Sequence, residues 1–120
     1  MKKDKFESDL LRGSLDLIVV SVLADGPQYG YAIQKSVRSA SREKVTLAAG
    51  TLYPLLHRLE ADKLIKSKWD DSTGRKRKWY DLTAKGRKRL QTQAFAWQQY
   101  ADCMRSLVER FASPEVFNPG

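Results

Sequence analysis

The chain has 120 residues, of which 42% are hydrophobic, and it carries a formal net charge of +8 at pH 7. This length fits one domain with an appended helix, and no apolar run reaches the roughly 18 residues that a membrane-spanning helix needs. The positive charge and a pI near 9.7 favour a polyanion such as nucleic acid as the partner.

A single cysteine, Cys103, excludes a disulfide within the chain and fits a reducing compartment. The start of the chain, residues 1–9, mixes charges of both signs and shows no small-residue cleavage site, so we do not predict a signal peptide. We therefore expect a cytoplasmic protein.

Three short helices are predicted in the first half of the chain. The first carries apolar residues at spacings of three and four and ends at the turn signal of residues 25–27; these residues are Leu11, Leu15, Ile18, Val19, Val22 and Leu23. The second begins near Tyr29 and Gly30 and ends at residues 39–41. Three short helices with tight connections indicate a helix-turn-helix.

The third helix is amphipathic and runs to about Lys63. Its leucines, at positions 52, 55, 56 and 59, share one face. Thr46 or Thr51 is expected to cap its start, and Pro54 is expected in or near its first turn, where a missing N–H costs least.

A change of period follows the third helix. Ile65, Ser67 and Trp69 alternate with lysines, and a second alternating run covers residues 77–82 beyond the polar turn of residues 70–74. Two antiparallel strands around a turn, placed after a helix-turn-helix, predict a winged helix over residues 10–83. The fold class is therefore α+β and mostly α.

Thr83 is predicted to cap a long last helix over residues 84–113. Its apolar residues follow an unbroken seven-residue repeat, which is typical of a helix that packs along another helix. The predicted dimerisation residues are Leu90, Ala94, Trp97, Ala101, Met104, Val108 and Phe111.

Basic residues concentrate on the wing and just beyond it. Residues 75–89 hold eight basic residues and one acid, which gives +7 of the total +8. Arg75, Lys76, Arg77 and Lys78 are predicted to neutralise phosphates or to enter a minor groove. The alternative is an edge hairpin protected by lysines, but protection needs one or two of them and not four cations in a row.

The exposed face of the third helix is the candidate surface for reading DNA. Thr51, Tyr53, His57 and Arg58 lie on it, and Arg58 and His57 are the side chains able to bond strongly to base edges. Tyr53 contacts phosphate or sugar, or else packs between the second and third helices.

Trp97 lies on the heptad seam and packs there by default. With small residues such as Ala101 beside it, two such rings across a two-fold axis could instead line a gap for a flat aromatic molecule.

No enzyme site is predicted. The fourteen acidic residues form no obvious acid/base pair, Cys103 has no histidine nearby in sequence, and no glycine-rich phosphate loop occurs. One His and one Cys cannot build a zinc site within one protomer, so no metal and no cofactor are expected.

Four segments together resemble the PadR family of transcriptional regulators, in particular its short members with a single C-terminal helix. They are LRGSL at 11–15, GPQYGY at 26–31, GTLYPLLHRLE at 50–60 and GRKRKWYDLTAKG at 74–86. The resemblance covers roughly residues 10–90.

The resemblance implies a dimer that binds a palindromic DNA operator, with the third helix in the major groove and the wing along the minor groove. It also implies that Tyr53 contacts DNA and that the last helix crosses to the partner. Trp97 falls where relatives line a flat pore at the dimer centre, and many relatives repress a gene until an aromatic effector binds.

These observations predict a homodimeric repressor that is released by a small aromatic effector. Two alternatives stay open: a winged-helix DNA binder without a small effector, and a winged helix that docks proteins or binds RNA.

Overall fold

The computed structural model describes residues 14–112. The chain divides into two compact units, of which the first ends at Leu90 and the second begins at Gln91. The elements in chain order are α2 (Leu15–Leu23), β1 (Gln28–Tyr29), α3 (Gly30–Ala40), α4 (Ala49–Ala61), β2 (Ile65–Asp70), β3 (Arg77–Leu82), α5 (Ala84–Val108) and a 3-10 turn (Glu109–Phe111). Leu11 and the end of the chain beyond Ala112 lie outside the described residues.

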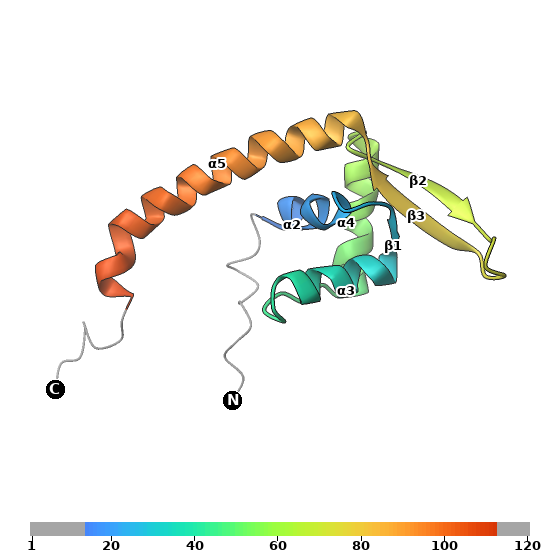
Figure 1. The fold of residues 1–120 in the computed structure, drawn as a ribbon, viewed down its shortest axis with the longest axis horizontal. Coiled ribbons are helices and arrows are strands. Elements are labelled where there is room, and N and C mark those ends of the chain that lie inside the picture. The colour runs from blue at the N-terminus through green and yellow to red at the C-terminus, as the bar shows by residue number, and fades with distance from the viewer. Residues whose placement is uncertain (1–13, 113–120) are drawn as a thin grey trace. The chain divides into compact units, whose positions relative to one another are not determined.

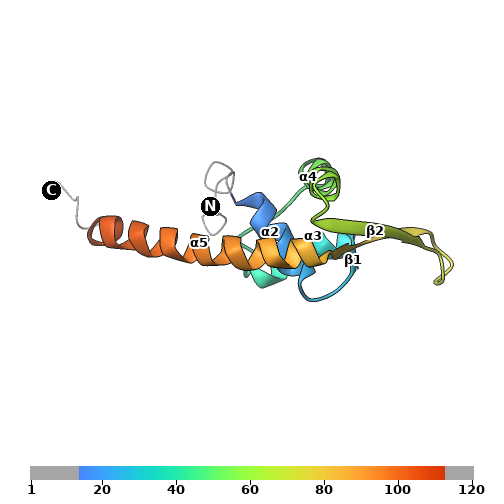
Figure 2. The same ribbon diagram turned by 90° about the horizontal axis from the view of Figure 1, so that it is seen from above.

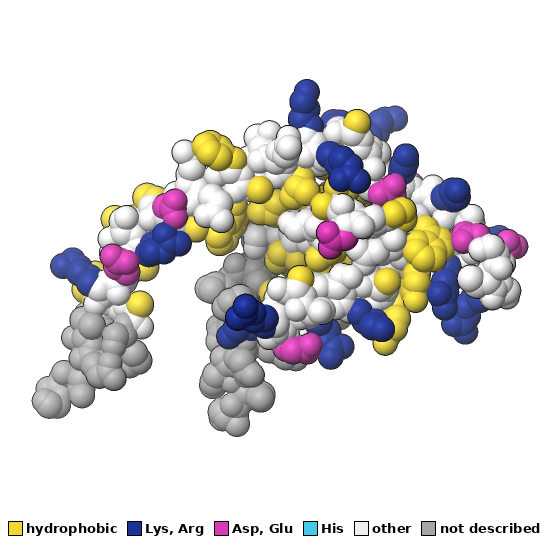
Figure 3. Space-filling view, in the orientation of Figure 1, with side chains coloured by type: hydrophobic (Ala, Val, Ile, Leu, Met, Phe, Trp, Pro, Cys, Tyr) yellow, Lys and Arg dark blue, Asp and Glu magenta, His cyan; other side chains and the backbone are white. Residues whose placement is uncertain are grey.

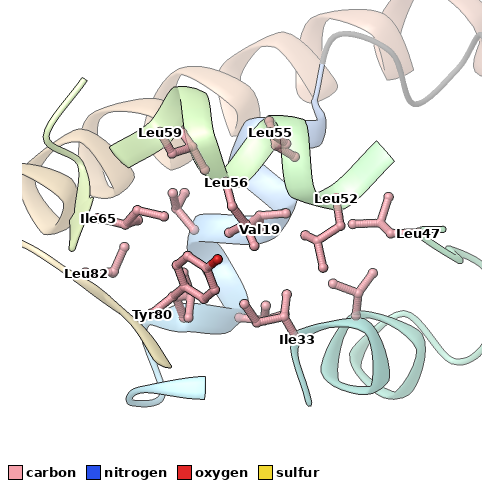
Figure 4. Packing of buried hydrophobic residues seen from close by; sticks show 14 of the residues in the cluster. Val19, Ile33, Leu47, Leu52, Leu55, Leu56, Leu59, Ile65, Tyr80 and Leu82 are labelled. Carbon is pink, nitrogen blue, oxygen red and sulfur yellow. The ribbon is translucent and has the colours of Figure 1, made fainter. Parts of the chain in front are cut away.

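The first unit is built around the three predicted helices. Leu52, Leu55, Leu56 and Leu59 of α4 are all buried, as their spacing predicted. They pack with buried residues of α2 and α3, among them Val19 and Ile33 (Figure 4). Burying each such side chain contributes roughly 1.5–3 kcal/mol, so this cluster holds the helix-turn-helix together.

The start of α4 differs from the prediction. Its N-cap residue is Ala48, and no side chain caps it, so the expectation of a Thr46 or Thr51 cap is wrong. The helix begins early enough that Pro54 lies in its second turn. The nitrogen of Pro54 cannot donate the bond that a helix normally makes four residues back, to the carbonyl of Gly50.

A small antiparallel sheet forms the wing (Figures 1 and 2). The β2–β3 hairpin has the predicted strands, with Ile65 opposite Leu82 and Asp70 opposite Arg77. The third strand, β1, pairs with β3 and gives the order β1-β3-β2. It has two residues, too few for an alternation to reveal it, so the sequence predicted only the hairpin. The fold class is confirmed.

Thr83 caps α5 as predicted. Its hydroxyl oxygen accepts a bond from the N–H of Gly86 at 2.9 Å, and the same hydroxyl donates to the Lys63 carbonyl at 2.7 Å. Gly86 is buried against the backbone of Leu64. These contacts fix the beginning of α5 to the segment that joins α4 to β2.

The second unit, described over residues 91–112, consists of the rest of α5 and the 3-10 turn. Large apolar side chains in this unit are exposed in the single chain: Phe95, Trp97, Tyr100, Met104, Leu107, Val108 and Phe111. This number of large exposed apolar side chains on one helix and its terminal turn is unusual for a surface that stays in water.

Candidate nucleic-acid interface

The outer face of α4 presents the residues that the sequence selected. Thr51, Tyr53, His57 and Arg58 are exposed, while the leucines of the same helix are buried. Tyr53 is 38% exposed, because part of its ring packs on Gly30 at the start of α3. Tyr53 therefore packs between the two helices and still presents an accessible edge, and its contact with DNA stays a prediction.

The wing ends in a compact turn that supports its cations. Asp70 accepts two bonds from Ser72, one from the backbone N–H and one from the hydroxyl, both at 3.1 Å. Gly74 has φ +86°, a conformation that other residues seldom adopt, and its N–H donates to the Asp71 carbonyl. Arg75 and Lys76 follow directly and are exposed.

Trp69 lies among the wing lysines. The ammonium of Lys76 is 5.3 Å from the centre of its ring and that of Lys78 is 5.8 Å from it, both within cation–π range. The ring is 57% exposed. Trp69 therefore offers a flat apolar surface beside two positive charges.

Arg77 occupies the other face of the hairpin and is held in place. Its guanidinium lies 4.3 Å from the centre of the Tyr29 ring, and Tyr29 meets Trp79 edge to face at 5.1 Å. Tyr29 and Trp79 are direct partners across the β1–β3 ladder. The Arg77 guanidinium thus lies over a ring that is itself braced by the edge-to-face contact with Trp79, which restricts the Arg77 side chain more than a free surface position would.

A hollow of about 690 Å³ lies between α4 and the wing. It brings Tyr53 and His57 together with three wing cations, and none of the described residues that line it is acidic. The complete lining is Tyr29, Gly30, Tyr31, Tyr53, His57, Trp69, Arg75, Arg77, Lys78 and Tyr80. Lys and Arg side chains also gather along the hairpin in the space-filling view (Figure 3). The hollow can therefore hold a polyanion with planar groups.

Tyr80 connects this hollow to the core. It is buried among the apolar residues of the cluster (Figure 4). Burial raises the pKa of its hydroxyl above the usual value of 10.0, and the nearby Tyr53 and Glu60 raise it further. Tyr80 therefore stays neutral at physiological pH and contributes no charge to the hollow.

Three of the predicted residues do not line the hollow: Thr51, Arg58 and Lys76. Arg58 instead forms an ion pair with Asp16 of α2, with 2.7 Å between Nη2 and Oδ1. Both side chains of this pair are about half exposed, so solvent screens the pair and it can exchange for another partner.

Sequence reasoning missed Tyr29, Tyr31 and Trp69 as parts of this surface. Alternation did place Trp69 on the same strand face as Ile65, but it did not indicate which part of that face is exposed. The face continues past the end of the core, so Ile65 is buried and Trp69 is not. The segment GPQYGY at 26–31 was recognised, but nothing in its spacing indicated contact with the wing.

In the second unit, Trp97 is 46% exposed and Ala101, one turn further along α5, is partly buried. Within residues 14–112, no group of three or more His, Cys, Asp or Glu side chains is placed to hold a metal ion. No helix within the same range is long and apolar enough to cross a membrane.

Comparisons with known proteins agree on one family. Residues 19–92 match the transcriptional regulator PadR-like family. A regulator from Clostridium thermocellum has a similar solved structure, with a TM-score of 0.73, 31% identity, and coverage of 88% of this chain and 100% of that one. The solved structure of a PadR family regulator from Eggerthella lenta has a TM-score of 0.72 and 37% identity, and the match covers 84% of this chain and 87% of that one. A transcriptional regulator of Mycobacterium tuberculosis is 34% identical over 90 residues, which cover 75% of this chain and 81% of that one.

Proposed function

The chain belongs to the PadR-like family of transcriptional regulators, and from this premise we propose that it is a homodimeric repressor of a palindromic DNA operator. The family consists of DNA-binding regulators and not of enzymes. The observation that carries the proposal is the hollow between α4 and the wing, where the lining within residues 14–112 consists of cations and aromatic rings without an acid.

DNA would be bound in two ways by each protomer. The exposed face of α4 enters the major groove, where Arg58 and His57 reach base edges and Thr51 and Tyr53 contact the backbone. The wing follows the adjacent minor groove, and Arg75, Lys76, Arg77 and Lys78 neutralise phosphates. The hollow then lies where the sugar-phosphate strand passes from one groove to the other.

Dimerisation is supported by the apolar side chains that the second unit exposes. Trp97, Met104, Val108 and Phe111 belong to the heptad seam of α5, and a second copy would bury them. Leu90, Ala94 and Ala101 complete this seam. The winged helix over residues 10–83 and the dimerisation helix over residues 84–113 thus have separate tasks. A two-fold axis would place two α4 helices on half-sites about 34 Å apart.

A small aromatic effector would bind beside Trp97 and Ala101 at the dimer axis. Its binding would change the angle between the winged-helix domains of the two protomers. Fluorescence tests this proposal directly. Planar aromatic compounds should quench the wild-type protein and the Trp69→Phe control, but not Trp97→Phe. If no compound in a broad panel quenches Trp97, the DNA binder without a small effector is the correct alternative.

Binding to the DNA that flanks its own gene tests the main proposal. A labelled duplex of that region should be shifted by the protein at low nanomolar to micromolar concentration, and an unrelated duplex of equal length only at higher concentration. A protein that ignores duplex DNA but binds RNA or a protein partner would refute the proposal. Light scattering during gel filtration should give the mass of a dimer. With this function, we propose that the protein acts in the cytoplasm.

A further inference from the structure

Gly30, the first residue of α3, is distinguished by what a side chain there would meet. A Cβ built on it would overlap the hydroxyl oxygen of Tyr53 and lie 2.6 Å from Cζ and 3.0 Å from Cε1 of the same ring. The three nearest atoms all belong to Tyr53. The φ of Gly30 is not positive, unlike those of Gly26 and Gly74, so this position needs glycine for space and not for backbone conformation.

The Tyr53 ring therefore has a defined position. It leaves α4, crosses to the start of α3 and lies with its hydroxyl against Gly30, yet it stays 38% exposed at the edge of the hollow. The neighbouring residue Tyr29 is tied to the wing, because it pairs with Trp79 and stacks under Arg77. Because Tyr29 and Gly30 are adjacent, this segment fixes the position of the Tyr53 ring relative to the wing cations.

We propose that Gly30 is a positioning residue for DNA binding: it makes the space that holds the Tyr53 hydroxyl at the DNA-facing hollow. This inference rests on the proposed function, because it assigns how one DNA contact of that function is aimed. A methyl group at position 30 displaces the ring and not the backbone, since the atoms it meets are the far end of a partly exposed side chain. Gly30→Ala therefore keeps the fold and misplaces the contact.

A double-mutant cycle on the intact protein tests this inference. Gly30→Ala should weaken operator binding at least about tenfold, because each protomer of the dimer loses a hydrogen bond to a charged group, and Tyr53→Ala should weaken it at least as much. In the Tyr53→Ala background, Gly30→Ala should change affinity less than twofold, because the atoms that it would displace are gone. Ser39→Ala, an exposed position at the other end of α3, is the control and should bind like the wild type.

The salt dependence separates positioning from a general disturbance of the interface. Tyrosine is neutral and displaces no counterion, so Gly30→Ala should lower affinity while the slope of log K against log salt stays as in the wild type. A smaller slope would mean that the wing cations had moved, and it would overturn the inference. So would a tenfold loss that persists without Tyr53, or a Gly30→Ala protein that binds as the wild type does. A wild-type protein that fails to bind duplex DNA would instead overturn the proposed function together with this inference.

Discussion

Gly86 is the position at which one added methyl group should damage the fold most. It lies in the first turn of α5, and a Cβ there would overlap the carbonyl oxygen of Leu64 and lie 3.0 Å from its carbonyl carbon. These are backbone atoms, so no side chain can rotate aside. In Gly86→Ala, either α5 or the start of β2 must shift.

The cost can be worked out from the bonds at this junction. Overpacking of a tight contact costs typically 1–3 kcal/mol. The N–H of Thr83 donates to the Leu64 carbonyl at 3.1 Å, and a shift that weakens this bond costs about 1 kcal/mol more. The better helix propensity of alanine returns at most about 1 kcal/mol. We therefore expect a net loss of about 1–3 kcal/mol.

Thermal unfolding followed by circular dichroism, at one fixed protein concentration, measures this loss. For a domain of this size the expected fall in Tm is about 5–20 °C. Gly50→Ala is the matched control, because it is also helical but a Cβ added there would meet no described atom within 4 Å beyond its own stretch of helix. It should unfold at or slightly above the wild-type temperature. A Gly86→Ala protein within about 2 °C of the wild type would refute the reasoning.

Three further predictions concern charge and pH. Asp16→Asn should strengthen DNA binding by up to about fivefold, because it frees the Arg58 guanidinium. In a binding titration this gain should vanish in an Arg58→Ala background, and a gain that persists there would reflect net charge alone. Arg75→Ala should weaken binding to all duplexes about equally, whereas Arg58→Ala should alter the preference among operator variants; the reverse pattern would mean that the wing reads bases. Folding raises the pKa of Tyr80, so the native state binds this proton more tightly and the free energy of unfolding should fall as pH rises above 10.0. In denaturant titrations, the free energy of unfolding of Tyr80→Phe should fall less steeply over the same pH range. An equally steep fall would assign the pH dependence to other groups.

Much of the fold could be predicted because it depends on short-range patterns. The leucine spacing of α4 fixes which face is buried, and the alternation before and after the polar turn fixes the register of the hairpin. The cap by Thr83 follows from one residue type at one boundary. In each case the signal lies within a few residues of the structure that it specifies.

The parts that could not be predicted depend on contacts between distant segments. β1 is a strand only because β3 lies beside it, and Arg58 pairs with an acid 42 positions earlier in the chain. The packing of Tyr53 on Gly30 likewise joins two helices. No periodicity encodes such pairs, so the composition of the hollow emerged only from the three-dimensional structure.

The salt dependence of operator binding tests the central claim most directly. If the four wing cations of each protomer neutralise phosphates, a dimer makes about eight such contacts, and the slope of log K against log salt is about −7. Affinity for the operator duplex should then fall about 10⁴-fold between 50 and 200 mM salt. A protein with Arg75, Lys76, Arg77 and Lys78 all replaced by alanine should lose most of this slope. An affinity that hardly changes with salt, or an equal slope in the two proteins, would contradict the account.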